Sequence, residues 1–228
     1  MPTISGPGPT YVSKAARRCE WAEGAGQAMA SYHDLEWGRP VLSESAMFGR
    51  LCLEAFQAGL SWILVLRRRE ALREAFAGFD PDAVAAFAED DVTRILAAPG
   101  VIRNRAKVAA SVGNARAVLE LRRSGRSLVE LVWAFRPEPG VVRSPAGSDW
   151  KELPSATEAS AALSREFRRC GIRFLGPTAA YALMQAAGLV NDHFAGCAVR
   201  AEVQREQEEA AAALGRPGAP AGGGGWAP

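Results

Sequence analysis

The sequence predicts an all-α protein, on three observations. Segments with apolar residues at helical spacing fill most of the chain, and capping residues precede several of them. Glycine and proline separate these segments where helices are expected to end. No stretch shows the alternation of apolar and polar residues that marks a half-buried strand. The chain has 228 residues, 48% of them hydrophobic, which allows one sizeable core and makes two full domains improbable.

The first half of the chain divides into five expected helices. Ser43 caps the first, which carries apolar residues such as Met47, Phe48 and Leu51 on one face. Gly78 breaks the second, and Pro81 suits the first turn of the third. The expected helices span 43–57, 61–76, a segment that begins at Asp80-Pro81, a short segment from near Asp90, and 106–123.

The second half continues this pattern after one interruption. A short helix over 128–135 is followed by a long loop, which Pro137, Pro139, Pro145 and Gly147 mark. A helix over 157–169 has an acid in its first turn and arginines in its last. Pro177 begins the final core helix, over 177–187, and Gly188 lies just past its end.

Composition divides the chain into three parts. Residues 1–18 are rich in Gly, Pro and Ser and are expected to be a disordered tail. The folded domain is expected over 19–200, and 201–228 would form a short polar helix followed by a Gly/Pro-rich tail. No apolar run is long enough to cross a membrane and the start lacks a signal-peptide core, so a cytoplasmic protein is predicted. The net charge of +2 neither requires nor excludes nucleic-acid binding, so a basic surface would have to come from local clusters of Lys and Arg.

Two cysteines and the two histidines stand in pairs near the ends of the expected domain. Cys19 and His33 are close in sequence at one end, and His193 and Cys197 form an H-x3-C pair at the other. A Cys2His2 set suits tetrahedral zinc, although ordinary core thiols and polar histidines explain the spacing equally well. Four protein ligands would leave no open position for water, so such a zinc would be structural. It would clip the N-terminal to the C-terminal segment. Cys52 and Cys170 are interpreted as buried thiols without a role.

Glu54 is the most informative acidic residue. It falls at the margin of the apolar face of its helix, where a carboxylate loses part of its hydration. A functional site is one interpretation of this position. The alternative is an ion pair with Arg50, four residues earlier, of little energetic consequence.

Two segments, 98–105 and 171–178, have the form helix, tight turn, helix, with a glycine in the turn. The second resembles the hairpin by which helix-hairpin-helix proteins hold a DNA phosphate on exposed backbone N–H groups. A solvated helix face explains the basic residues near both turns as well as DNA contact does. They are Arg103, Arg105, Lys107, Arg165, Arg168, Arg169 and Arg173.

Taken together, these segments resemble the bacterial DNA-3-methyladenine glycosylase I family. The matching strings are Cys19-Glu20-Trp21, YHDLEWG (32–38), LCLEAFQAGLSWILVLRRRE (51–70), GVIRNRAKV (100–108), FLGPTAAYALMQAAGLVNDH (174–193) and Cys197. They cover about 19–199 in order, and YHDxEWG together with QAGLSW is highly specific. The resemblance implies a helix-hairpin-helix glycosylase fold whose structural zinc is bound by Cys19, His33, His193 and Cys197.

The resemblance also implies the activity and its residues. Members hydrolyse the N-glycosidic bond of 3-methyladenine in double-stranded DNA after flipping the nucleotide out of the stack. By resemblance, Glu54 and Tyr32 supply polar catalytic contacts, and Trp62, Trp37 and Trp21 enclose the cationic base. Gly176, Pro177 and Thr178 would contact the DNA backbone. A monomer without lyase activity is expected, because no lysine matches the Schiff-base position at the hairpin.

Two residues call for comment against the family pattern, and two alternative functions remain open. Met29 stands where the family often has an aromatic residue, and Asp192 is expected only to orient His193. The chain would alternatively be a non-catalytic, zinc-stabilised helix-hairpin-helix DNA-binding module, although such a module needs no base pocket. A zinc hydrolase acting on small molecules is the third possibility, and the closed ligand set argues against it.

Overall fold

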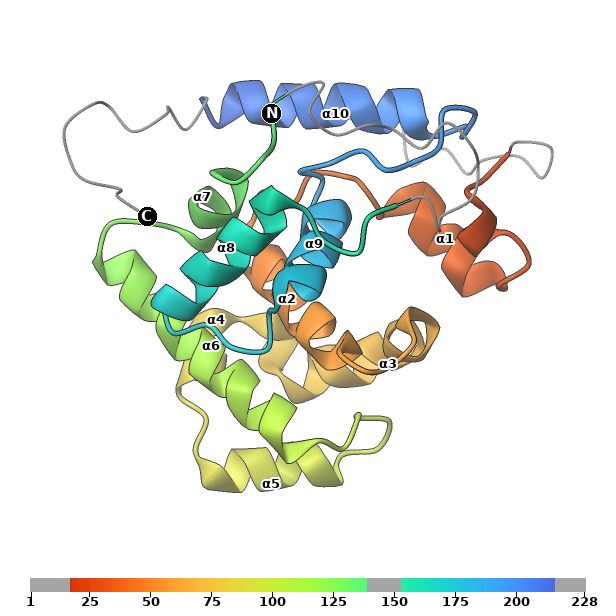
Figure 1. The fold of residues 1–228 in the computed structure, drawn as a ribbon. Helices are drawn as coiled ribbons and strands as arrows, with labels where there is room; N and C mark the ends of the chain where they lie inside the picture. Colours follow the sequence, from red (N-terminus) through yellow and green to blue (C-terminus); the bar gives the residue numbers. More distant parts are fainter. Residues whose placement is uncertain (1–16, 139–152, 216–228) are drawn as a thin grey trace, which may run out of the picture.

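Helices joined by turns make up the computed structural model, which describes residues 17–138 and 153–215 (Figure 1). Within these ranges there is no strand, so the all-α prediction is confirmed. The predicted tails, apart from Arg17, Arg18 and the stretch up to Gly215, lie outside the described residues, as does most of the proline-marked loop. None of the described helices combines the length and apolarity needed to cross a membrane.

The helices agree closely with the expected segments. They are α1 (Gln27–Leu35), α2 (Glu44–Gln57), α3 (Trp62–Ala75), α4 (Pro81–Ala85), α5 (Glu89–Ala97), α6 (Arg105–Arg123), α7 (Leu128–Trp133), α8 (Glu158–Arg169), α9 (Pro177–Ala186) and α10 (Arg200–Ala213). Ser43 caps α2 as predicted, because its hydroxyl accepts from the N–H of Ala46. Helix α1 was not anticipated, and it begins after Gly26, which has no side chain to act as a cap.

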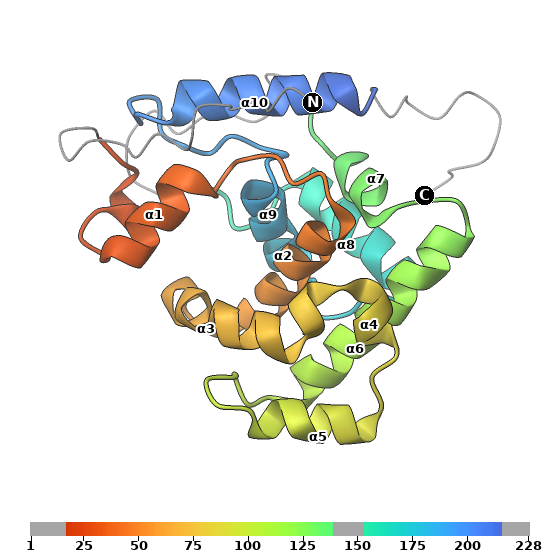
Figure 2. The same ribbon diagram turned by 180° about the vertical axis from the view of Figure 1, so that it is seen from behind.

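The main core surrounds α2 and α9, which lie at the centre of the molecule in both ribbon views (Figures 1 and 2). Helix α2 is buried on most sides, and Phe48, Leu51 and Phe56 are among its fully buried side chains. Helix α9 contributes Leu183 and Met184 to the same core. Helices α8 and α6 pack against α9 and α4 respectively, so the hairpin between α8 and α9 is anchored on the core.

A second, smaller apolar cluster joins the two ends of the described chain. It contains Cys19, Tyr32 and Trp37 from the N-terminal side, with Cys197 and Val203 from the C-terminal side. Trp21 and Trp62 pack on it and are partly exposed. Trp62 packs on both this cluster and the main core, and the cluster contains Tyr32 as well as Cys19 and Cys197, so the predicted metal ligands lie next to predicted pocket residues.

Helix α10 lies across one end of the molecule and is not an isolated polar helix (Figure 1). Val203, Gln207 and Ala210 are buried along one side of it. The Gln207 side-chain amide donates to the carbonyls of Gly38 and Val190 at 2.7 and 3.0 Å. The helix therefore packs on the loops that contain Trp37 and His193, beyond the expected domain end at residue 200.

Candidate functional site

The four predicted metal ligands come together in the structure. One ligand atom from each of Cys19, His33, His193 and Cys197 lies within 4.8 Å of every other, and all four residues are buried. The Sγ atom of Cys197 lies 3.4 Å from Nε2 of His33 and 3.3 Å from Nδ1 of His193. The Sγ atom of Cys19 lies 3.6 Å from the same Nδ1 atom. Tetrahedral zinc with nitrogen and sulfur ligands places its donors about 3.3–3.8 Å apart. These three sulfur–nitrogen distances therefore fit zinc.

The hydrogen bonds of both imidazole rings point the correct nitrogen at the cluster. Nε2 of His193 lies 3.1 Å from the carbonyl oxygen of Trp37, which can only accept, so this nitrogen is the protonated one. Nδ1 of His33 lies 2.9 Å from the Asp34 carboxylate, which a bidentate contact with Arg18 holds in place. In each ring the other nitrogen faces the thiols, and Nε2 of His33 also accepts from the main-chain N–H of Cys19 at 3.2 Å. This is the arrangement that metal-ligating histidines adopt.

The contacts within the cluster favour a thiolate at Cys197 only, because the hydrogen bond to Cys197 and burial raise the pKa of the Cys19 thiol. The Cys19 thiol donates to the Cys197 sulfur and lowers the pKa of Cys197 to about 2, and the two histidine rings act in the same direction. Burial raises the pKa of Asp34, but hydrogen bonds from Arg18 and His33 outweigh it and the pKa is lowered. A thiolate beside two neutral imidazoles is a ligand set for a soft or borderline cation.

Asp192 does not orient His193, contrary to expectation. Its Oδ2 atom accepts from the Tyr181 hydroxyl at 2.6 Å and from the Gln185 amide at 2.8 Å. Its Oδ1 atom has no hydrogen-bond partner among the described residues. The main-chain carbonyl of Trp37 orients His193 instead, because the loop after α1 passes directly over the ring.

Glu54 is buried in α2 with one carboxylate oxygen unsatisfied. The residue is 3% exposed, and Oε2 has no hydrogen-bond partner among the described residues. Burial raises the pKa of Glu54 to about 8, against the opposing effect of the Arg50 guanidinium. Burial therefore favours the protonated form of Glu54 at neutral pH. A buried unpartnered carboxyl points to a ligand that supplies the missing contact.

Aromatic rings surround the region next to Glu54. The rings of Tyr32 and Trp62 lie 5.0 Å apart between centroids, and Trp62 Nε1 is a second buried polar atom without a partner in the described structure. Trp21 lies 6.3 Å from Tyr32 and 4.9 Å from Trp37. Trp37 in turn lies 4.6 Å from the ring of His193. A continuous series of aromatic contacts thus joins the pocket to the metal ligands, with Trp37 next to the ligands and Trp62 next to Tyr32.

Arg50 and Glu36 belong to this site, although the sequence reasoning missed the contacts that place them there. The Arg50 guanidinium lies 5.5 Å from the centroid of the Tyr32 ring and donates to Glu36 at 2.8 Å. Arg69 of α3 donates to the other oxygen of Glu36 at 2.6 Å. The predicted ion pair between Arg50 and Glu54 is absent from the hydrogen bonds of the described residues. Arg50 acts on Glu54 only through its charge.

The hairpin and Glu54 line one cavity. A cavity of about 450 Å³ is lined by Glu54 and by residues of two turns, the α2–α3 turn and the start of α9. They include Gly59, Leu60, Gly176, Pro177 and Thr178. Asn114 of α6 fixes the hairpin, because its amide side chain accepts from the N–H of Arg173 at 2.7 Å and donates to the carbonyl of Arg173 at 3.1 Å. Glu54 and the predicted backbone contacts therefore open onto the same space.

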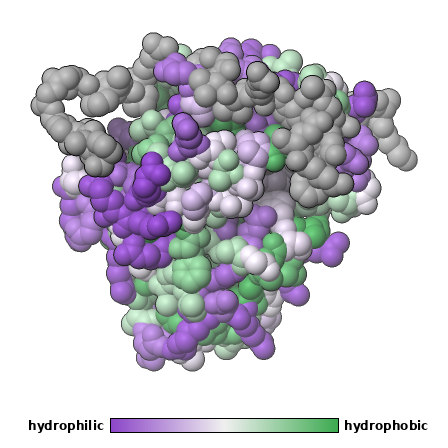
Figure 3. All heavy atoms as spheres, in the orientation of Figure 1, coloured by the Kyte–Doolittle hydropathy of each residue, from purple (hydrophilic) through white to green (hydrophobic). Residues whose placement is uncertain are grey.

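The basic residues near the two turns divide into exposed and buried ones. Arg103, Arg105, Arg165, Arg168 and Arg173 are exposed, and Figure 3 shows hydrophilic residues on the side of the molecule where α8 lies. Lys107 is buried and takes no part in this surface, contrary to its grouping by sequence. The two turns are thus surrounded by arginines that are accessible to a polyanion.

Comparisons with known proteins agree with this geometry. A family described as methyladenine glycosylase matches residues 21–201. DNA-3-methyladenine glycosylase 1 of Escherichia coli is 45% identical over 79% of this chain and 95% of its own length. A crystal structure of 3-methyladenine DNA glycosylase I superposes with a TM-score of 0.75 at 42% identity, over 80% of this chain and 98% of that one.

A further solved structure, of the Staphylococcus aureus 3-methyladenine DNA glycosylase I, concerns its recognition of 3-methyladenine. It superposes with a TM-score of 0.73 at 28% identity, over 80% of this chain and 96% of that one. The matched region holds Glu54, the aromatic rings, the hairpin and three of the four cluster residues, since Cys19 lies just before its start, and it ends where α10 begins. This chain belongs to the methyladenine glycosylase family.

Proposed function

We propose that this protein excises 3-methyladenine from alkylated double-stranded DNA by hydrolysing the N-glycosidic bond, without lyase activity. The observation that supports it best is the unsatisfied Glu54 carboxyl in a cavity that opens at the hairpin. Methylation at N3 makes the adenine cationic. An aromatic face and a buried carboxylate both favour a cation over neutral adenine.

The reaction needs little from the protein beyond positioning. The bond between C1′ and the base breaks, and its electron pair leaves with the base, which becomes neutral. A water molecule adds its oxygen to C1′ and loses a proton. Because the cationic base is already a good leaving group, the contribution of the pocket is to hold the extruded base. Glu54 accepts from the exocyclic amine, Tyr32 adds a polar contact, and Trp62, Trp37 and Trp21 form the aromatic walls.

We propose that the Cys19, His33, His193 and Cys197 cluster holds one structural zinc ion. The donor spacing and the ring orientations described above support this assignment. When bound, the ion supplies four covalent links between the two ends of the domain and no reacting group. The cluster holds Trp37 and Trp21 in contact with Tyr32, so the chain's own residues transmit its rigidity to the pocket.

The hairpin is the proposed contact with the DNA backbone. Gly176, Pro177 and Thr178 form the start of α9, where N–H groups without helical acceptors face outward. Pro177 and Thr178 are exposed, which leaves this helix end open to a phosphate. We propose that the protein binds as a monomer and that the exposed arginines add sequence-independent attraction.

The test is release of free base from methylated duplex DNA by the parent and by Glu54→Gln. We expect the parent to release 3-methyladenine, detected by chromatography, and Glu54→Gln to release it at least about 10-fold more slowly because a neutral amide attracts the cation less. Helical content and metal content of the variant serve as controls. An inactive parent with full metal content would favour the non-catalytic DNA-binding module.

A further inference from the structure

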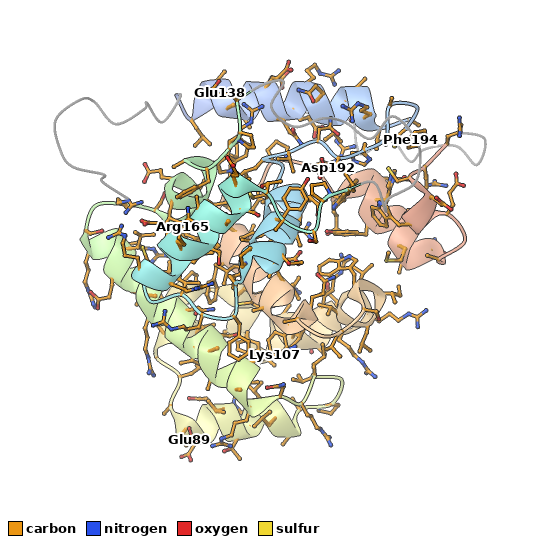
Figure 4. All side chains as sticks on the ribbon, in the orientation of Figure 1. Glu89, Lys107, Glu138, Arg165, Asp192 and Phe194 are labelled. Carbon is orange, nitrogen blue, oxygen red and sulfur yellow. The ribbon has the colours of Figure 1, made fainter. Side chains whose placement is uncertain are left out.

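Lys107 is a buried cation with no part in the proposed chemistry. It lies in the first turn of α6 and is 6% exposed (Figure 4). Its Nζ atom donates to the carbonyl of Phe56 at 2.7 Å and to the carbonyl of Ala58 at 2.6 Å. Burial lowers the pKa of Lys107, because the charged ammonium loses hydration at this position.

The two acceptor carbonyls lie at the end of α2, in the segment that connects Glu54 to Trp62. Glu54 lies in the last turn of α2, and Trp62 is the first residue of α3. The N–H of Leu60 bonds to Gln57, so it does not close a helical bond to Phe56. The Phe56 and Ala58 carbonyls are therefore free for Lys107, and a cation at a helix C-terminus is electrostatically favourable.

The segment that these bonds restrain is otherwise open to solvent. Ala58, Gly59 and Leu60 are exposed, and Gly59 has φ +77°, which a helix cannot continue. The same residues line the cavity with Glu54. The main chain of Lys107 is also held in place, because the Asn104 side chain caps α6 and accepts from the Lys107 N–H at 3.1 Å.

We propose that Lys107 is a positioning residue for the base pocket, which sets the separation of Glu54 and Trp62 by bonding both carbonyls at the α2–α3 turn. The proposal rests on the proposed function, since the pocket is the one that would hold the extruded base. A small displacement of the Glu54 carboxylate relative to the Trp62 ring is sufficient to lower both the affinity for the base and the rate of excision.

The test compares full-length Lys107→Met and Lys107→Arg with the parent. Methionine keeps most of the volume and removes the donors, whereas arginine keeps a cation that reaches the helix end with different geometry. Binding of free 3-methyladenine is followed by tryptophan fluorescence, and excision by single-turnover release from methylated duplex DNA. Arg123→Met, which removes an exposed cation at the far end of the same helix, is the matched control.

We expect Lys107→Met to weaken base binding and slow excision by about 10-fold or more each, with Lys107→Arg between it and the parent and Arg123→Met unchanged. A purely structural role would lower Tm in both Lys107 variants and leave affinity and rate at parental values well below Tm, which would overturn the proposal. If Lys107→Met fails to fold, Lys107→Arg decides: parental affinity and rate overturn the proposal, and a loss of both in folded protein supports it. A parent that binds the base without releasing it would count against the proposed function alone, because affinity still tests Lys107.

Discussion

Glu54 shows how the substrate's charge completes the site. The structure buries a carboxyl, leaves one oxygen unsatisfied and raises its pKa to about 8. Arg50 lowers that pKa from a distance but contacts Tyr32 and Glu36 instead. A cationic base entering the pocket would favour the ionised carboxylate, whereas neutral adenine would not. Discrimination between damaged and normal adenine is then an electrostatic property of one buried residue.

The pH dependence of excision follows from this pKa. If the substrate is attracted to ionised Glu54, kcat/KM should rise about 10-fold per pH unit below pH 8 and level off above it, because the charged fraction of the free enzyme rises over that range. The N3-methylated base in DNA keeps its charge throughout, so the profile reports the enzyme. Initial rates between pH 6 and 9 provide the measurement, and Glu54→Gln should flatten the profile. A flat parental profile would contradict the assignment.

Ionisation of Glu54 should destabilise the folded protein at neutral and alkaline pH. A carboxyl whose pKa is raised on folding binds its proton more tightly in the native state, so stability falls as pH rises from 4.5 towards 8. Glu54→Gln removes this ionisation and should raise the free energy of unfolding at pH 8 by roughly 1–3 kcal/mol. Urea unfolding at pH 8 and pH 5 makes the comparison, and the gain should shrink at pH 5. A destabilised Glu54→Gln at pH 8 would refute this reasoning.

Helix α10 lies almost wholly beyond the family match. The family match ends at residue 201, while the buried face of α10 continues to Ala210. Arg39 extends the contact, since its guanidinium pairs with Glu202 and Glu206 and also donates to the carbonyl of Asp34 at 3.0 Å. The helix is therefore attached to the end of α1 and to the loop before His193.

Removing the contacts of α10 should lower stability more than activity. Gln207→Ala leaves the buried carbonyls of Gly38 and Val190 without a donor, for a cost of about 1–3 kcal/mol and a fall in Tm of several degrees. Glu208→Ala, on the exposed side, is the control and should stay within about 0.5 kcal/mol of the parent. Differential scanning calorimetry measures both. Equal Tm values for the two variants would show that α10 does not stabilise the body.

Local signals explain which elements the sequence predicts. Ser43, Asp80 and Pro177 mark helix starts, and the structure begins α2, α4 and α9 next to them. Helix α1 lacks such a mark, because Gly26 provides no capping side chain. The packing of α10 was not predictable from composition. Only Val203, Gln207 and Ala210 are buried in this helix. Because one of the three is a polar Gln, the sequence shows no continuous apolar face.

At the scale of the whole molecule, the N- and C-terminal segments meet at the Cys/His cluster, and the predicted pocket residues extend from it. Residue type and spacing make this ligand set one of two equal interpretations, and the margin of an apolar face makes Glu54 a candidate. The family resemblance is what assigns both. The sequence does not predict that Arg50 lies over Tyr32 or that Lys107 is buried. Those contacts depend on how α2, α3 and α6 pack, which no local pattern specifies.

Loss of the cluster should therefore affect both stability and the adjoining pocket. Cys19→Ser removes one of four metal ligands and should release the ion and lower Tm by roughly 10 °C or more, since structural zinc contributes folding free energy. Because Trp37 packs on His193 and Trp21 packs on both Trp37 and Tyr32, affinity for free 3-methyladenine should fall as well. Cys170→Ser, at a half-buried thiol outside the cluster, is the control. Metal content by atomic absorption, Tm by calorimetry and affinity by tryptophan fluorescence distinguish the outcomes. A metal-free Cys19→Ser protein with parental Tm would exclude a structural ion, and one with lowered Tm but parental affinity would show that the aromatic contacts do not couple the cluster to the pocket.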